Sequence, residues 1–120
     1  MVIKMNVLQL RQRIIRSMIR TSDRTKNIRR PEKYIYRDYL NDAYMRMLRL
    51  CIKANRQRGE VRKKLQCELD TELEVIKGLV DIAASPEDPV ISVGLHEVWS
   101  KELSEIGRMI GGWIKSDAGK

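Results

Sequence analysis

Apolar residues recur every three or four positions through four long segments of the chain, and no segment sustains an alternation of apolar and polar residues. The first pattern is typical of amphipathic α-helices, whereas alternation would indicate half-buried β-strands. The sequence therefore predicts four helices, over residues 3–27, 35–57, 60–84 and 92–115. Residues that interrupt helices separate these segments: Pro31, Gly59 and the run from Ser85 to Pro89.

Four helices with short connections predict an all-α fold, an up-down-up-down antiparallel four-helix bundle. We expect a single domain over residues 1–116, followed by a flexible tail over residues 117–120. The apolar stripe of the first helix contains Ile3, Val7, Leu10, Ile14 and Met18, with Leu8, Ile15 and Ile19 beside it. The stripes of the next two helices include Tyr36, Leu40, Tyr44, Met47, Cys51 and Ala54, and then Val61, Leu65, Leu69, Leu73, Ile76, Val80 and Ala83. The last stripe contains Leu95, Trp99, Leu103, Ile106, Ile110 and Trp113.

The two halves of the chain carry opposite net charges. Residues 1–58 hold 16 Lys and Arg against 4 Asp and Glu, a net charge of +12. Residues 59–120 hold 8 against 12, a net charge of −4. This asymmetry predicts an electropositive surface on the first half and a polyanionic partner, of which nucleic acid is the commonest in a cytoplasm.

Basic residues follow one another at helical spacing on the first two helices and in the loop between them. The guanidinium group is a planar fork that binds two phosphate oxygens at once, so these residues are candidates for phosphate contact. The alternative is a solvated face, but such a face usually mixes both signs, and residues 1–30 hold a single acid, Asp23. The predicted nucleic-acid-binding residues are Arg11, Arg13, Arg16, Arg20, Arg24, Lys26, Arg29, Arg30, Lys33, Arg37, Arg46, Arg49, Lys53 and Arg56.

Four tyrosines lie beside the basic loop. Tyr36 and Tyr44 fall on the apolar stripe of the second helix, which favours core packing for both. For Tyr34 and Tyr39 two interpretations stay open, since an exposed tyrosine beside cations can also stack on an unpaired base.

The sequence predicts no catalytic residue, no metal ligand and no cofactor. Acidic residues cluster at Glu68, Glu72 and Glu74, but a di-iron bundle also needs two Glu-x-x-His pairs. The one histidine is His96, and a valine lies three residues before it. Cys51 and Cys67 lie on either side of Gly59, so a disulfide across two facing helices is conceivable, and a packed pair of reduced thiols is the other interpretation.

Three glycines occur inside the helical pattern of the last segment, in the run EIGRMIGGWIKS from Glu105 to Ser116. Each glycine costs a helix about 1 kcal/mol relative to alanine, so a gain elsewhere must offset it. Glycines four residues apart share a face and allow a second helix to approach closely. We expect a homo-oligomer interface formed by Gly107, Met109, Gly111, Gly112 and Trp113; the alternative is that the glycines merely fray the helix end.

Several runs of residues resemble the accessory variability determinant (Avd) family. They are ELDTELEVIKGLV from Glu68 to Val80, EIGRMIGGWIKS, LCIKANR from Leu50 to Arg56, and PEKY from Pro31 to Tyr34. The resemblance covers most of the chain from Pro31 to Ser116, and EIGRMIGGW is its most specific part.

The resemblance implies a place in a diversity-generating retroelement. In these cassettes an error-prone reverse transcriptase copies a template repeat and transfers mutations, mostly at adenines, into a variable gene. The family members are non-catalytic four-helix bundles that assemble into a positively charged pentameric barrel. They bind the template RNA, with DNA or an RNA–DNA hybrid as further candidate ligands, and they associate with the reverse transcriptase.

Two other functions fit the same residues. A related four-helix family is encoded in ribosomal RNA intervening sequences, and a scaffolding bundle of that kind would dock an acidic protein partner. The first helix also combines apolar and basic faces as interfacial helices do, but it lacks Trp and Phe, and the bundle needs its apolar face. No apolar run approaches the roughly 20 residues that span a bilayer, and the N-terminus lacks the layout of a signal peptide. We therefore expect a cytoplasmic protein without membrane contact.

Overall fold

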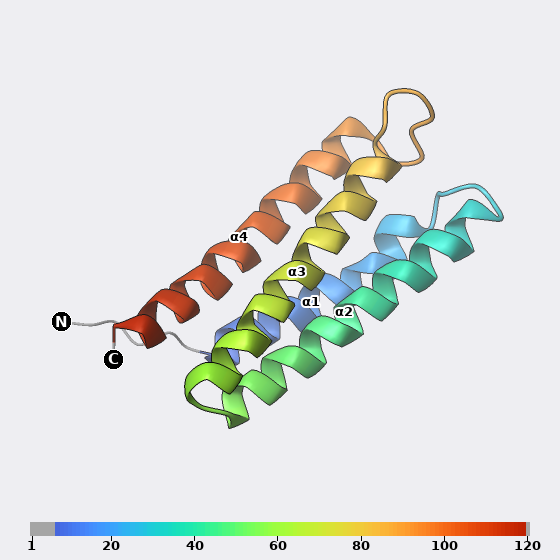
Figure 1. The fold of residues 1–120 in the computed structure, drawn as a ribbon. Helices are drawn as coiled ribbons and strands as arrows, with labels where there is room; N and C mark the ends of the chain where they lie inside the picture. The colour runs from blue at the N-terminus through green and yellow to red at the C-terminus, as the bar shows by residue number, and fades with distance from the viewer. Residues whose placement is uncertain (1–6, 120) are drawn as a thin grey trace.

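The computed structural model describes residues 7–119, which form four long α-helices joined by short loops (Figure 1). The helices are α1 (Val7–Thr25), α2 (Glu32–Arg56), α3 (Gly59–Ala83) and α4 (Val93–Ala118). Each helix end within the described residues lies within three residues of its predicted position. The predicted start of the first helix, residues 3–6, lies outside the described residues.

Each helix packs against two others and runs antiparallel to both (Figure 1). Contacts join α1 to α2 and α4, and α3 likewise contacts both α2 and α4. The result is an elongated molecule of 48 × 24 × 21 Å. The predicted all-α architecture with four bundled helices is therefore confirmed.

The turns between helices use the residues that the sequence singled out. Gly59 adopts φ +61°, a left-handed conformation that favours glycine, at the tight turn from α2 into α3. The Ser92 hydroxyl accepts a hydrogen bond from the Leu95 amide at 3.0 Å and so caps the start of α4. These two features explain why α3 and α4 begin where they do.

The core contains apolar residues from all four helices, but α1 contributes fewer of them than its sequence predicts. Leu10 and Ile14 are fully buried, whereas Ile19 is 71% exposed. Beyond Ile14 the inward face of α1 carries three buried hydroxyl residues instead: Ser17, Thr21 and Thr25. Thr21 and Thr25 donate hydrogen bonds to the carbonyl four residues earlier, at 3.2 and 2.8 Å, so their burial leaves no hydroxyl unpaired.

Two residues in the first turns of their helices also depart from the predicted core. Leu8 at the start of α1 and Val61 at the start of α3 are 58% and 56% exposed. Both lie in the first turns of their helices, at the end of the bundle, where fewer neighbouring helices are available to cover them. The remaining stripe residues of α3 and α4 are buried or half-buried.

The C-terminal end of α4 is held against the turn between α2 and α3. Asp117 accepts hydrogen bonds from Arg62 at 3.3 Å and from Gln66 at 3.0 Å. Arg62 also donates to the carbonyls of Ala54 and Gln57 near the end of α2, at 3.0 and 2.7 Å. The expected tail over residues 117–120 therefore needs correction, because α4 continues through Ala118. Residue 120 lies outside the described residues.

Candidate nucleic-acid interface

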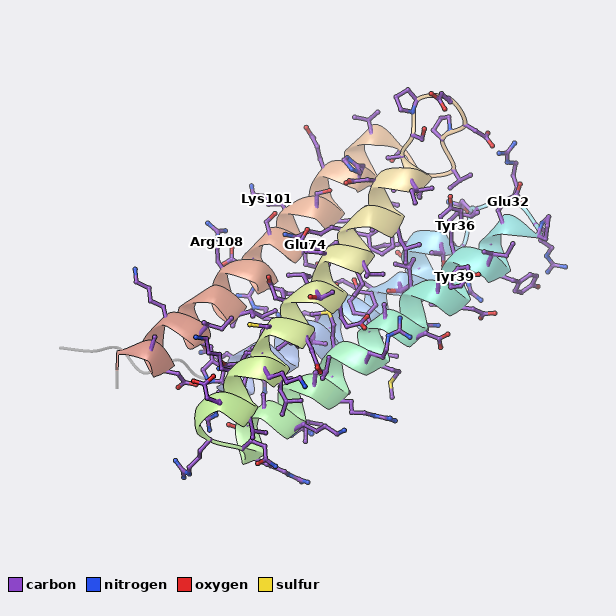
Figure 2. The ribbon with its side chains drawn as sticks, in the orientation of Figure 1. Glu32, Tyr36, Tyr39, Glu74, Lys101 and Arg108 are labelled. Carbon is purple, nitrogen blue, oxygen red and sulfur yellow. The ribbon has the colours of Figure 1, made fainter. Side chains whose placement is uncertain are left out.

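Three of the predicted arginines lie in a row along the side of α1 that faces α4. Arg13, Arg16 and Arg20 border a groove of about 400 Å³ between the two helices. The opposite wall includes Lys101, which projects from α4 in Figure 2. Sequence patterning did not single out Lys101, because periodicity alone does not show which side of α4 faces the basic helix.

Arg24, the fourth member of the row, points into the bundle. Its guanidinium donates to both carboxylate oxygens of Glu102, at 3.0 and 2.9 Å, and lies 5.2 Å from the centre of the Trp99 ring. Only 9% of its side chain is exposed. Arg24 is therefore a contact between α1 and α4 rather than part of the surface expected to bind phosphate.

Glu102 on α4 connects the arginine row of α1 to the partly buried contact between the two helices. Arg20 also donates to it, at 2.6 Å, although the Arg20 side chain is half exposed. Burial raises the pKa of Glu102, but hydrogen bonds from Arg24, Ser17 and Arg20 outweigh this effect and hold the pKa below its ordinary value. Glu102 thus stays ionised and neutralises part of the row.

The basic residues around the loop between α1 and α2 are partly paired as well. Arg29 forms an ion pair with Asp88 at 2.8 Å, and Lys26 forms one with Asp23 at 2.9 Å. Both pairs are exposed, and such pairs contribute little to stability and leave the cations accessible. Arg30 is exposed and Lys33 half-buried.

The second row runs along the outer face of α2. Arg49, Lys53 and Arg56 are exposed, and within residues 7–119 no acidic side chain forms an ion pair with them. Arg46, at the start of the row, contacts Glu72 on α3 at 3.0 Å. Arg11 on α1 and Arg56 border a shallow hollow together. Arg37 is half-buried, and its buried Nε has no hydrogen-bond partner among the described residues.

The four tyrosines divide as their positions on the helix predict. Tyr44 is fully buried and Tyr36 half-buried against the core. Tyr34 and Tyr39 are 45% and 59% exposed, and Arg30 lies 5.4 Å from the centre of the Tyr34 ring. The two exposed rings remain candidates for base stacking.

The glycine-rich part of α4 does not form one continuous surface. Gly107 faces α3, since a Cβ there would lie 3.3 Å from Leu73 Cδ2. Trp113 is 3% exposed and belongs to the core of its own bundle, so it cannot contact another copy as expected. Gly111 and Gly112 are exposed, and outside the adjacent helix backbone no atom of the described residues lies within 4 Å of a Cβ added at either one; Met109 is half-buried. Of the residues expected at an oligomer interface, Gly111, Gly112 and the exposed edge of Met109 are the ones still accessible to another copy.

The cysteines and the histidine have separate surroundings. Cys51 is buried, which raises its pKa to about 11, and Cys67 is exposed; both are free thiols. They are therefore neither bonded nor a buried pair. His96 contacts Asp81 at 2.8 Å. Within residues 7–119, no three His, Cys, Asp or Glu side chains are grouped closely enough to hold a metal ion.

Among the described residues, no helix has both the length and the hydropathy needed to cross a bilayer. The apolar residues of each helix are instead concentrated on the face that packs against its neighbours.

Comparison with known proteins links the whole bundle to one family description. A family model described as bAvd-like matches residues 8–117. The match begins at the second residue of α1 and ends in the last turn of α4, so it includes all four helices. No curated protein and no solved structure matches the chain.

Proposed function

The chain belongs to the bAvd-like family, and on this premise we propose that it is the non-catalytic accessory protein of a diversity-generating retroelement. In this role it acts in the cytoplasm, binds the template RNA of the element and associates with its reverse transcriptase. The complex supports mutagenic cDNA synthesis. The reverse transcriptase supplies the chemistry, and this protein supplies binding and positioning of the RNA.

The observation that carries the proposal is a set of six exposed cations with no acidic partner among the described residues. Three border the groove between α1 and α4, and three lie along the outer face of α2. They are Arg13, Arg16 and Lys101, and Arg49, Lys53 and Arg56. Like charges at helical spacing repel each other by a few tenths of a kcal/mol per pair, so an unneutralised row favours an external polyanion.

Binding through these residues would be directed at the RNA backbone. Arginine and lysine contacts to phosphate position a nucleic acid without reading its sequence. Sequence selection would then come from the reverse transcriptase and from pairing within the RNA. Exposed Tyr34 and Tyr39 add a means of holding unpaired bases, since a ring stacks on any base.

We also propose that the bundle assembles into a ring of identical subunits, with five as the number implied by the family resemblance. A ring pools the cations of all subunits into one positive surface. Exposed Gly111 and Gly112 support close approach of a neighbouring helix, because no neighbouring side chain among the described residues lies within 4 Å of a Cβ added at either position. The acidic half of one subunit can also face the basic half of the next, given the net charges of −4 and +12.

The direct functional test is reconstitution of cDNA synthesis. Reverse transcriptase and template RNA are combined with and without this protein, and cDNA yield is measured. We expect synthesis to depend on the protein, and an equal yield without it would contradict the proposal. A competition assay tests the alternative function. An acidic protein with the same net charge as an RNA fragment competes with that RNA for binding to this protein, and preferential binding of the acidic protein would favour a scaffolding function instead.

A further inference from the structure

The groove between α1 and α4 is lined by cationic side chains from two different helices. Arg13, Arg16 and Arg20 come from α1, and Lys101 comes from α4. Its volume of about 400 Å³ is large enough for a phosphate group with its neighbouring sugar atoms. A ligand there is contacted from both sides, which a single convex helix face does not allow.

Two acids also border the groove, but each is already paired. Glu102 accepts two hydrogen bonds from Arg24, whose side chain is buried. It accepts a third from Arg20. Glu105 pairs with Arg108 one turn further along α4. Within the described residues this leaves Arg13, Arg16 and Lys101 without an acidic partner.

Arg20 shares Glu102 with Arg24 but remains partly accessible to a ligand in the groove. Its side chain is 49% exposed, whereas that of Glu102 is 14% exposed. A phosphate in the groove can therefore approach the exposed side of the Arg20 guanidinium while Glu102 holds the other side. The carboxylate then positions Arg20 rather than blocking it.

From these contacts we propose that the groove between α1 and α4 is the principal phosphate-binding site for a single strand of nucleic acid. This inference rests on the proposed function and deepens it, since it assigns the strand to one of two cationic surfaces. Arg13, Arg16 and Lys101 contact phosphates directly, and Arg20 contacts one while paired with Glu102. The row on the outer face of α2 contributes long-range attraction.

The length of the arginine row matches several phosphates. Arg13 and Arg20 are seven residues apart, which corresponds to about 10.5 Å along the helix axis. One strand of a nucleic-acid helix carries a phosphate about every 3.4 Å of axis. A single strand that keeps this stacked spacing therefore places about three phosphate intervals along the row.

The test compares two triple variants that remove equal charge. The groove variant is R13Q/R16Q/K101Q, which leaves the pairs of Arg20 and Arg24 with Glu102 intact. The control variant is R49Q/K53Q/R56Q on α2. Affinity for a labelled RNA is measured by fluorescence anisotropy over a range of salt concentrations, and helicity and the unfolding midpoint of each variant are measured alongside.

We expect the groove variant to lose about a hundredfold in affinity at 0.1 M salt and to reduce the slope of log K against log salt by about 2. The control should lose less than about tenfold, because its charges act at longer range. Equal losses, or a larger loss in the control, would overturn the groove assignment while leaving RNA binding itself intact. Failure of the unmodified protein to bind RNA would overturn the proposed function and the groove with it.

A second measurement uses the unmodified protein and so does not depend on variant folding. Lysines are acetylated with and without bound RNA, and modification at each site is quantified by mass spectrometry. Lys101 should be protected at least several-fold, whereas Lys115, also exposed on α4, should not. Protection of Lys53 with none at Lys101 would overturn the proposal.

Discussion

The buried hydrogen bonds of Tyr44 connect three helices, and the variant Tyr44→Phe tests what they contribute. The Tyr44 hydroxyl accepts a hydrogen bond from Trp99 Nε1 at 3.0 Å and lies 2.6 Å from Ser17 Oγ. All three residues are at most 1% exposed. Burial raises the pKa of the Tyr44 hydroxyl above its ordinary value, so it keeps its proton near neutral pH.

The expected cost follows from which groups lose a partner. In the variant the indole N–H of Trp99 is left buried without its acceptor. An unsatisfied buried donor costs about 1–3 kcal/mol. We therefore expect Tyr44→Phe to lower the free energy of unfolding by about 2 kcal/mol.

Urea denaturation followed by circular dichroism measures this change. With a denaturant slope of about 2 kcal/mol per molar urea, the midpoint should fall by about 1 M. Tyr36→Phe is the matched control on the same helix, since Tyr36 is half-buried and its hydroxyl forms no hydrogen bond with another described residue. Protein concentration is kept equal because assembly would shift both midpoints. If Tyr44→Phe is no more destabilising than Tyr36→Phe, the buried hydrogen bonds do not contribute as argued.

Two further predictions concern the glycines and the buried carboxylate. Gly111→Ala should raise the free energy of unfolding of the separate subunit by up to about 1 kcal/mol through helix propensity. Gly107→Ala should raise it less or lower it, because Leu73 must shift to admit the new Cβ. If urea denaturation gives the reverse order of stability, these placements are wrong. If Gly111 also contacts a neighbouring subunit, light scattering should show that Gly111→Ala lowers the assembled mass. Because the pKa of Glu102 is lowered in the folded protein, its contribution to stability is present above about pH 4.5 and is lost as the pH falls further. The free energy of unfolding should therefore decline less steeply below that pH in Glu102→Gln than in the unmodified protein, and parallel declines would refute the assignment.

The fold was predictable from the sequence because each helix has a regular apolar stripe and an unmistakable end. Gly59 marks a turn that needs a left-handed residue, and Ser92 offers a hydroxyl at a helix start. The pattern failed on α1, where it favoured Ile19 as a core residue. The inward face of α1 continues after Ile14 through Ser17 and Thr21, and Ile19, two residues from each, lies off that face.

The candidate site was only partly predictable, because residue spacing along one helix does not reveal which residues of the other helices lie beside it. The row of arginines on α1 was evident, but its division into exposed and buried members depends on Glu102, 78 residues away from Arg24. The same holds for Lys101, which joins the groove only because α4 packs beside α1. Trp113 was expected both in the core and at a subunit interface, and its burial decides for the core.

The salt dependence of RNA affinity tests most directly whether the exposed cations bind phosphate. Filter binding or anisotropy is performed with the unmodified protein and a labelled RNA between about 50 and 200 mM salt. The four groove cations of each subunit, pooled over two or more subunits of the proposed ring, give six or more phosphate contacts. Such a number predicts a linear fall of log K with log salt and a loss of about a thousandfold or more over this range. An affinity that does not change with salt, or the absence of saturable binding at the lowest salt, would contradict the central claim.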